Sequence, residues 1–199
     1  MVQKDCQELK KYIFLCKNDD NYHQNLASQF LLGLRINTLF TMAKGKNFIG
    51  LDEKIANDLA TDLNDLLANY QIYYQNLRGF HWNIQGASFF ELHLKFEEYY
   101  NDARIKIDEI AERILTLGET PSHTLSDYVA ESKIKEAKNV HDGQEGVKIT
   151  SDNISVLLKK ERLILKKASE AGDEGTVTLL SEYITQQEKV LWMLHSYLA

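Results

Sequence analysis

Two histidines and two carboxylates in the middle of the chain have the residue types of a metal site. His81 and His93 lie in the segment FHWNIQGASFFELHLKFEEYY, and Asp108 and Glu112 lie in KIDEIAERILTLG. Imidazole nitrogens and carboxylate oxygens together form a common ligand set for iron or zinc. The spacing of the four residues therefore decides whether one metal ion could contact all of them.

The spacing indicates a site shared between subunits. The stretch Phe89–Leu117 contains no proline or glycine and reads as one continuous helix. On this helix Asp108 and Glu112 are four residues apart and share a face. His93 and Asp108 lie on nearly the same face but roughly 22 Å apart along the axis. A single ion cannot span that distance, so the histidines of one subunit must meet the carboxylates of another. An antiparallel two-fold pairing of this helix would create two equivalent sites.

The overall composition favours a soluble helical protein. The chain has 199 residues, enough for one well-buried domain, and only one proline, Pro121. Its formal net charge of −6 argues against a generally basic surface for nucleic acids and fits a protein that attracts cations. No apolar run reaches the roughly 18 residues of a membrane span. Cys6 and Cys16 form neither a disulfide framework nor a metal cluster, so we expect a reducing, cytoplasmic setting.

The first 41 residues differ from the rest of the chain. They contain both cysteines, little helical periodicity, and four lysines, one arginine and four acids. A secretory signal would carry its apolar core nearer the N-terminus than the apolar stretch at residues 30–42. We therefore expect residues 1–41 to be a disordered or peripheral extension, or an upstream stretch preceding a true start at Met42.

Four long helices are expected after this extension. From Leu51 onward, apolar residues recur at intervals of three and four, and Asp52 is a suitable N-cap for the first helix. Gly79 lies near the expected end of that helix. The second helix covers Phe89–Leu117 and is closed by Gly118.

The remaining helices are separated from the first two by a long connection at residues 123–139, where the segment SDYVAESKIKEA is expected to contain a short helix. The third helix is expected at residues 144–171 and the fourth at 176–198, with a break at Gly172. Such a connection lets the two middle helices of a bundle run parallel. The prediction is an all-α, ferritin-like four-helix bundle with a long crossover connection that carries a short helix.

Three segments carry a resemblance to a known family: LRGFHWNIQGASFFELHLKFEEYY, IDEIAERILTLG and EKVLWMLHSYL. Residues 42–199, expected to form one domain, resemble the Dps proteins, the mini-ferritins of bacteria and archaea. The pattern HWN-x-x-G, with a second histidine twelve residues after the first and then D-E-x-x-E, is specific to that family. The resemblance implies a hollow dodecamer that oxidises Fe(II), preferentially with hydrogen peroxide, and stores ferric oxide as protection against oxidative stress. It implies His81, His93, Asp108 and Glu112 as iron ligands, with the two acids supplied across the dimer interface.

Each of these residues also has an ordinary structural interpretation. His81 could bond backbone carbonyls at a helix end, His93 could be a half-exposed surface residue, and the two acids could belong to a solvated face. The joint spacing of all four favours the metal site. In the family an aromatic residue at the place of Trp82 lies close to the iron, so Trp82 is a candidate catalytic residue that takes up oxidising equivalents. Packing in the core or at an interface is the alternative role for Trp82.

Other aromatic residues are expected to have packing roles. Tyr99 and Tyr100 lie near the midpoint between His93 and Asp108, where they are expected to pack at a dimer axis. Trp192 is expected to pack in the core. A within-subunit di-iron centre of the larger ferritins would use E-x-x-H pairs, and the sequence contains none.

The turn Gly172–Thr176 resembles the turn before the last helix of the family, where acids line three-fold iron-entry pores. Asp173 and Glu174 are the candidate pore residues, with helix capping and solvation as the alternative. Thr178 stands where some relatives carry a further acid, which weakens the resemblance at this point.

DNA binding is the alternative function, because some relatives condense the nucleoid with a lysine-rich tail. Here Lys44 and Lys46 precede the first helix, and four further lysines lie upstream among four acids: Lys4, Lys10, Lys11 and Lys17. Phosphate binding needs clustered, net positive charge. The sequence therefore favours a cytoplasmic iron-oxidising homo-oligomer over a nucleoid-associated protein, and a structural bundle without metal would leave the four-residue spacing to coincidence.

Overall fold

A computed structural model describes residues 46–199, which contain four long helices and one short one. The helices are α3 (Glu53–Asn83), α4 (Phe89–Leu117), α5 (Leu125–Glu131), α6 (Gly143–Ala171) and α7 (Glu174–Leu198). Within this part of the chain, β-pairing is limited to isolated bridges. The all-α four-helix bundle is therefore confirmed, whereas the expected extension at residues 1–41 lies outside the described residues.

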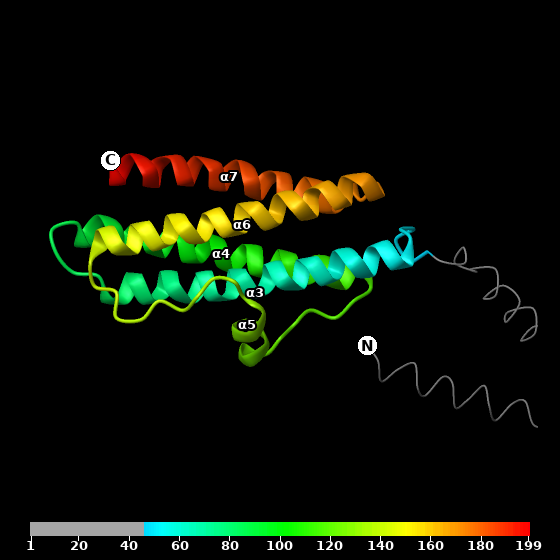
Figure 1. The fold of residues 1–199 in the computed structure, drawn as a ribbon, viewed down its shortest axis with the longest axis horizontal. Helices are drawn as coiled ribbons and strands as arrows, with labels where there is room; N and C mark the ends of the chain where they lie inside the picture. Colours follow the sequence, from blue (N-terminus) through cyan, green and yellow to red (C-terminus); the bar gives the residue numbers. More distant parts are fainter. Residues whose placement is uncertain (1–45) are drawn as a thin grey trace, which may run out of the picture. The chain divides into compact units, whose positions relative to one another are not determined.

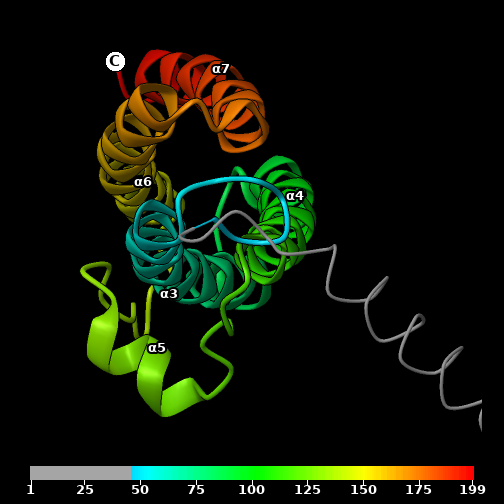
Figure 2. The ribbon, with the colours of Figure 1, turned by 90° about the vertical axis from the view of Figure 1, so that its right-hand side faces the viewer.

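The long helices pack in two pairs, α3 with α4 and α6 with α7, and α3 also packs against α6 (Figure 2). Helices α4 and α6 run in the same direction (Figure 1). The chain between them must return along the bundle, and this crossover carries α5, which lies against α3. The expected connectivity and the short helix are both present.

Side-chain amides of α3 hold the crossover in place. The Oδ1 atom of the buried Asn69 accepts hydrogen bonds from the backbone amides of Lys133 and Ile134, at 3.0 and 3.1 Å. Two turns later, Asn76 Oδ1 accepts from the backbone amide of Ala137 at 2.8 Å. These bonds satisfy backbone groups of an irregular segment that would otherwise lose their water partners.

Helix α3 begins as expected and ends later. Asp52 caps it by accepting a hydrogen bond from the backbone amide of Ile55 at 3.0 Å. The helix continues through Gly79 to Asn83. A helical glycine costs only about 1 kcal/mol relative to alanine, and continuing the helix buries Phe80 in the core. The extra turn carries His81 and Trp82, so both are helical residues.

Helix α4 has the predicted bounds, and Gly118 and Gly172 end α4 and α6 in the left-handed conformation, with φ of 98° and 71°. The core prediction for Trp192 is wrong within the described chain, because its side chain is 67% exposed. The buried positions of α7 include Leu180, Tyr183 and Leu194, and their helical periodicity turns residue 192 away from the bundle.

Candidate metal centre

The two histidines come together where α3 ends and α4 begins. His81 lies in the last turn of α3 and His93 in the second turn of α4. A short turn joins the helices, and Gly86 within it has a φ of 102°, which a residue with a side chain adopts rarely. The two imidazole rings stack with their centroids 3.8 Å apart and their planes within 17°.

Each histidine is oriented by the backbone of the other. The Nδ1 atom of His81 lies 2.7 Å from the carbonyl oxygen of His93, and Nδ1 of His93 lies 2.8 Å from the carbonyl oxygen of His81. A carbonyl oxygen only accepts hydrogen bonds, so both Nδ1 atoms must donate. In each neutral ring the lone pair then lies on Nε2, the usual arrangement of a metal-binding histidine. Bonding to carbonyls and ligand function are therefore compatible here.

Aromatic side chains surround the histidine pair. The ring of Phe89 stacks on His93 at 5.0 Å, and the ring of Tyr100 meets His81 edge-on at 5.4 Å. Trp82 is 57% exposed, which excludes the core-packing role within the described subunit. The guanidinium of Arg78 lies 4.6 Å from the centroid of the Trp82 ring, a favourable cation–π geometry.

The two carboxylates do not join the histidines within one subunit. Asp108 and Glu112 are exposed on α4, and neither forms an ion pair or a side-chain hydrogen bond with another described residue. Among residues 46–199, no group of three or more potential His, Cys, Asp or Glu ligands is close enough to hold an ion. This agrees with the helical length that separates His93 from Asp108.

Two of the basic neighbours of these carboxylates are paired with other acids, whereas the third, Arg104, is exposed and forms no ion pair with a described residue. Lys106 pairs with Asp102, and Arg113 pairs with Asp173. Neither cation neutralises Asp108 or Glu112. The two acids are thus available to a cation that reaches this face of α4 from outside the subunit.

The turn before α7 uses its first acid for capping. Asp173 is 3% exposed and accepts hydrogen bonds from the backbone amide and hydroxyl of Thr176, at 3.1 and 2.6 Å, and from Arg113 at 2.5 Å. Burial opposes ionisation, but the bonds from Arg113 and Thr176 outweigh it and lower the pKa of Asp173. Within the subunit Asp173 caps α7, the alternative predicted for it, and its pore role stays a prediction. Glu174 is exposed, and its pore role stays a prediction.

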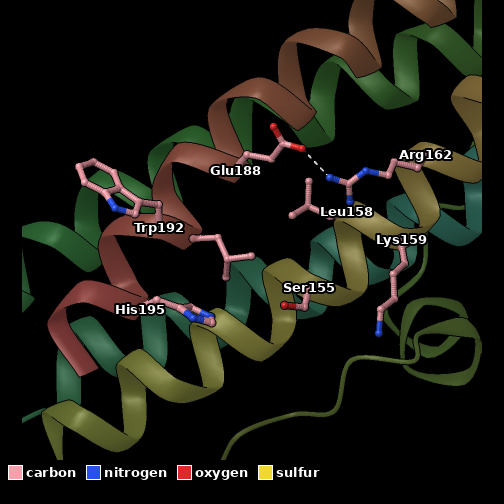
Figure 3. A pocket seen from close by; sticks show the side chains of 8 residues that line it. Ser155, Leu158, Lys159, Arg162, Glu188, Trp192 and His195 are labelled. Carbon is pink, nitrogen blue, oxygen red and sulfur yellow. Dashed lines mark hydrogen bonds and ion pairs between the residues drawn. The ribbon is translucent and has the colours of Figure 1, made fainter. Parts of the chain in front are cut away.

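A groove between α6 and α7 has a volume of about 460 Å³ and contains His195, Glu188 and Trp192 (Figure 3). The carboxylate of Glu188 is already paired with Arg162 at 2.5 Å. One imidazole and one engaged carboxylate are too few ligands for a tight metal site. The α3–α4 histidines therefore remain the stronger candidate.

Comparisons with known proteins decide the family. Residues 60–199 match the ferritin-like domain. A DNA protection during starvation protein of Porphyromonas gingivalis is 44% identical over 78% of this chain and 98% of its own length. The solved Dps protein of Vibrio cholerae, described as a ferritin-like diiron-carboxylate protein, is 52% identical over 79% of this chain and 99% of its own, with a TM-score of 0.77. This chain belongs to the Dps family.

Further comparisons within the Dps family agree. An uncharacterised protein of Haemophilus influenzae is 48% identical over 76% of this chain and 94% of its own. The solved Dps protein of Bacillus brevis is 37% identical, covering 73% of this chain and 98% of its own, with a TM-score of 0.71. Among residues 46–199, no helix combines the length and the apolar character that a membrane crossing needs.

The structure adds two contacts to the Dps pattern that the sequence reasoning missed. Arg78 lies over Trp82 and also over Tyr74, at 5.3 Å, and Tyr100 meets His81 edge-on. Residues 74, 78 and 82 are four apart on one helix, so their spacing could have indicated the Arg78 contacts. The Tyr100 contact joins two helices and left no such signal.

Proposed function

We propose that this Dps-family protein oxidises Fe(II) at sites shared between two subunits, with hydrogen peroxide as the preferred oxidant, and stores the ferric product in a dodecameric shell. One observation carries the proposal. His81 and His93 form an oriented pair with both Nε2 atoms available, while Asp108 and Glu112 stand unpaired on the same helix as His93. The histidine pair offers neutral nitrogen ligands, and the acid pair offers the anionic oxygen ligands that the histidines lack.

The exposed face of α4 supports an antiparallel pairing of two subunits. Leu94 and Ile105 are 64% and 52% exposed, although large apolar side chains gain by burial. Their midpoint in the sequence nearly coincides with that of His93 and Asp108. A two-fold axis near residue 100 would therefore cover both apolar side chains and bring the carboxylates of one subunit to the histidines of the other. Tyr100 would lie beside this axis.

The ligands suit iron as substrate. Neutral imidazoles hold Fe(II) without adding charge, and the hard, anionic oxygens of Asp108 and Glu112 favour the ferric product. Two Fe(II) ions supply the two electrons that convert one hydrogen peroxide and two protons into two water molecules. Because both electrons come from iron, the peroxide bond is broken without releasing a one-electron-reduced oxygen species.

Trp82 is the candidate for taking up an oxidising equivalent when only one Fe(II) is available. It follows His81 on the last turn of α3, is largely exposed, and has the Arg78 cation over its ring. Exposure in the single subunit also fits packing at the proposed interface. Trp82→Phe would separate the roles, because phenylalanine packs similarly and is much harder to oxidise.

The test is complementation between two inactive chains. One chain carries His81→Ala and His93→Ala, and the other carries Asp108→Ala and Glu112→Ala. Each mixed dimer then contains one intact site and one site without any of the four ligands. Random pairing of equal amounts should restore roughly a quarter of all sites. Peroxide-driven Fe(II) oxidation is followed after anaerobic loading, and oxygen is tested in parallel to compare the oxidants.

The control mixes each variant with itself, after the same dissociation and reassembly. No recovery in the mixed sample, with assembly verified by light scattering, would show that the two ligand pairs do not form shared sites. Oxidation by oxygen as fast as by peroxide would leave the shared site in place but remove the peroxide preference.

DNA protection is a second candidate function, favoured by the similarity to the DNA protection during starvation protein of Porphyromonas gingivalis. Among the described residues, Lys46 is the one lysine that precedes α3, and it is exposed. A gel shift across a range of salt, with chains beginning at Met1 and at Met42, tests the role of the upstream lysines. Binding that weakens steeply with salt only in the longer chain would assign it to them.

A further inference from the structure

Helix α6 begins beside the turn that joins α3 to α4, and hydrogen bonds tie the two segments together (Figure 1). The backbone amide of Gln85 donates to the carbonyl oxygen of His141 at 2.9 Å, and Gln85 and Asp142 form an isolated parallel bridge. The Nδ1 atom of His141 lies 3.0 Å from the carbonyl oxygen of Asn83. A carbonyl oxygen only accepts, so Nδ1 donates. Asn83 is the last residue of α3, so this bond satisfies a carbonyl group that lacks a donor within the helix.

The first turn of α6 packs closely against buried side chains of α3 and α4, and its two glycines leave room for this contact. A β-carbon on Gly143 would lie 2.5 Å from the Cδ1 atom of Leu92. A β-carbon on Gly146 would lie 3.2 Å from the Cζ atom of Phe96 and 3.7 Å from the Cγ atom of Phe80. Glycine is unfavourable inside a helix, so the close approach of α6 gives a physical reason for both.

These contacts reach the histidine pair through its neighbours in the sequence. Phe80 directly precedes His81, Leu92 directly precedes His93, and both apolar side chains are buried. The ring of Phe80 also meets that of Phe96, with the centroids 5.4 Å apart, so α3 and α4 touch next to the histidines. Because each histidine bonds to the backbone of the other, the positions of their Nε2 atoms depend on how these two helix turns are spaced.

We propose that the segment His141–Gly146 positions the histidine pair, by holding the last turn of α3 against the second turn of α4. Its first residue binds the end of α3 through the carbonyl oxygen of Asn83, and its last residue lets α6 pack directly on the rings of Phe80 and Phe96. Metal ligands must be held within about 0.5 Å of their binding geometry, so a small shift of these turns changes metal affinity. The inference rests on the proposed function, because it requires that the two histidines bind a metal ion.

The first test compares two helical glycines. Gly146→Ala adds a methyl group that the rings of Phe80 and Phe96 must move to accommodate, whereas Gly79→Ala adds one to α3 at a place where no described atom lies within 4 Å. Co²⁺ is titrated into the assembled full chain, because its visible absorption spectrum reports the ligand geometry. Gly146→Ala should bind Co²⁺ at least about tenfold more weakly, as when a supporting contact at a metal site is lost, and with an altered spectrum. Gly79→Ala should bind Co²⁺ as the wild type does.

A second pair of variants removes and restores the hydrogen bond to Asn83. His141→Ala deletes the donor, whereas His141→Asn keeps one, because the amide nitrogen of asparagine occupies about the place of Nδ1. The position is exposed, so both variants should fold. The loss of one hydrogen bond should weaken Co²⁺ binding by about three- to tenfold in His141→Ala, and His141→Asn should restore the wild-type affinity. In iron oxidation, the KM for Fe(II) should rise in Gly146→Ala and His141→Ala by a larger factor than kcat falls.

A purely structural role of the segment predicts a different result. Gly146→Ala and His141→Ala would then melt at lower temperatures but keep the Co²⁺ affinity and spectrum of the wild type. That result would overturn the inference and leave the proposed iron site in place. If Gly146→Ala does not assemble, the two His141 variants decide the question by themselves. A Co²⁺ spectrum that is the same in the wild type and in His81→Ala/His93→Ala would show that the histidines bind no metal, and the proposed function would then fail together with this inference.

Discussion

The protein has two clusters of polar side chains, and they differ in their exposure to solvent. The α3–α4 cluster contains two partly buried histidines and, farther along α4, two exposed carboxylates. Within the described subunit, the histidines and the carboxylates do not come close enough to bind one ion together. The bundle core holds Glu161, Tyr70 and Gln187 in direct contact, with no exposed carboxylate surface. The first cluster is open and incomplete, and the second is closed, with a carboxyl group whose pKa is raised by burial and which forms no ion pair with a described residue.

This difference shows how burial determines what can complete a site. Water stabilises the unpaired Asp108 and Glu112, so leaving them free costs little until another subunit arrives. Glu161 Oε2 is buried and has no hydrogen-bond partner among the described residues, so bulk water does not stabilise it in the same way. A surface cluster can therefore depend on assembly, whereas a core cluster must be satisfied inside each subunit.

The largest expected effect comes from removing both histidines of the open cluster. Loss of a supporting contact at a metal site already costs about 10- to 100-fold, so His81→Ala/His93→Ala should slow peroxide-driven Fe(II) oxidation by more than about 100-fold. Stopped-flow absorbance of the ferric product measures the rate. Circular dichroism should show unchanged helix content, because neither side chain belongs to the buried core.

The matched control is His123→Ala, which removes an exposed histidine bonded only to the carbonyl of Pro121. It should oxidise iron at the wild-type rate. Wild-type rates in the double variant as well would rule out the α3–α4 histidines as iron ligands.

Removing one hydroxyl from the closed cluster should affect stability instead. Tyr70→Phe deletes the donor to Glu161 and the acceptor for Gln187 at a fully buried position. Leaving buried polar groups unsatisfied should cost about 1–3 kcal/mol, or roughly 2–4 °C in melting temperature per kcal/mol for a chain of this size. Calorimetry measures the shift, and the iron-oxidation rate per folded subunit should not change. If Tyr70→Phe lost most of its iron-oxidation activity without losing stability, the two clusters would be functionally coupled.

A smaller effect is expected in the pH dependence of stability. Burial raises the pKa of Glu161 above its ordinary value of 4.5. The folded state then binds the proton more tightly than the unfolded state. The contribution of Glu161 to the stability of the folded state is fully present below pH 4.5 and is lost as the pH rises through the raised pKa. In chelator-treated protein, Glu161→Gln should remove this loss. The free energy of unfolding of the variant should therefore rise relative to that of the wild type as the pH increases.

Melting temperatures of both proteins between pH 4 and 8, after chelation, would measure this difference. A difference that does not depend on pH would mean that Glu161 keeps one protonation state throughout this range.

The smallest effect is expected from removing the first 41 residues, which include none of the residues named in the two clusters. A chain beginning at Met42 should assemble and oxidise iron at an unchanged rate, because the first amphipathic helix is capped by Asp52 and begins at Glu53. Size-exclusion chromatography and stopped-flow kinetics compare the two chains. A truncated chain that fails to assemble would show that the upstream residues take part in the shell.

The sequence by itself determined the helices and the separation between the two ligand pairs of the open cluster. Helix α4 has the predicted bounds because it contains no breaker before Gly118, and Asp52 caps α3 as its residue type indicated. These are local properties, set by the residue itself and its near neighbours. The distance between His93 and Asp108 also follows from helical rise alone, so the proposal that a second subunit completes the site could be made without coordinates.

Only the tertiary structure decided how side chains from different helices meet. The reciprocal bonds of His81 and His93, the burial of Asp173 against Arg113, and the outward direction of Trp192 all depend on which faces pack together. The same holds for Glu161, which reads in the sequence as one more acid on a charged helix. Its burial and its hydrogen bonds from Tyr70 and Gln187 are properties of three packed helices, because they depend on long-range contacts rather than on local spacing.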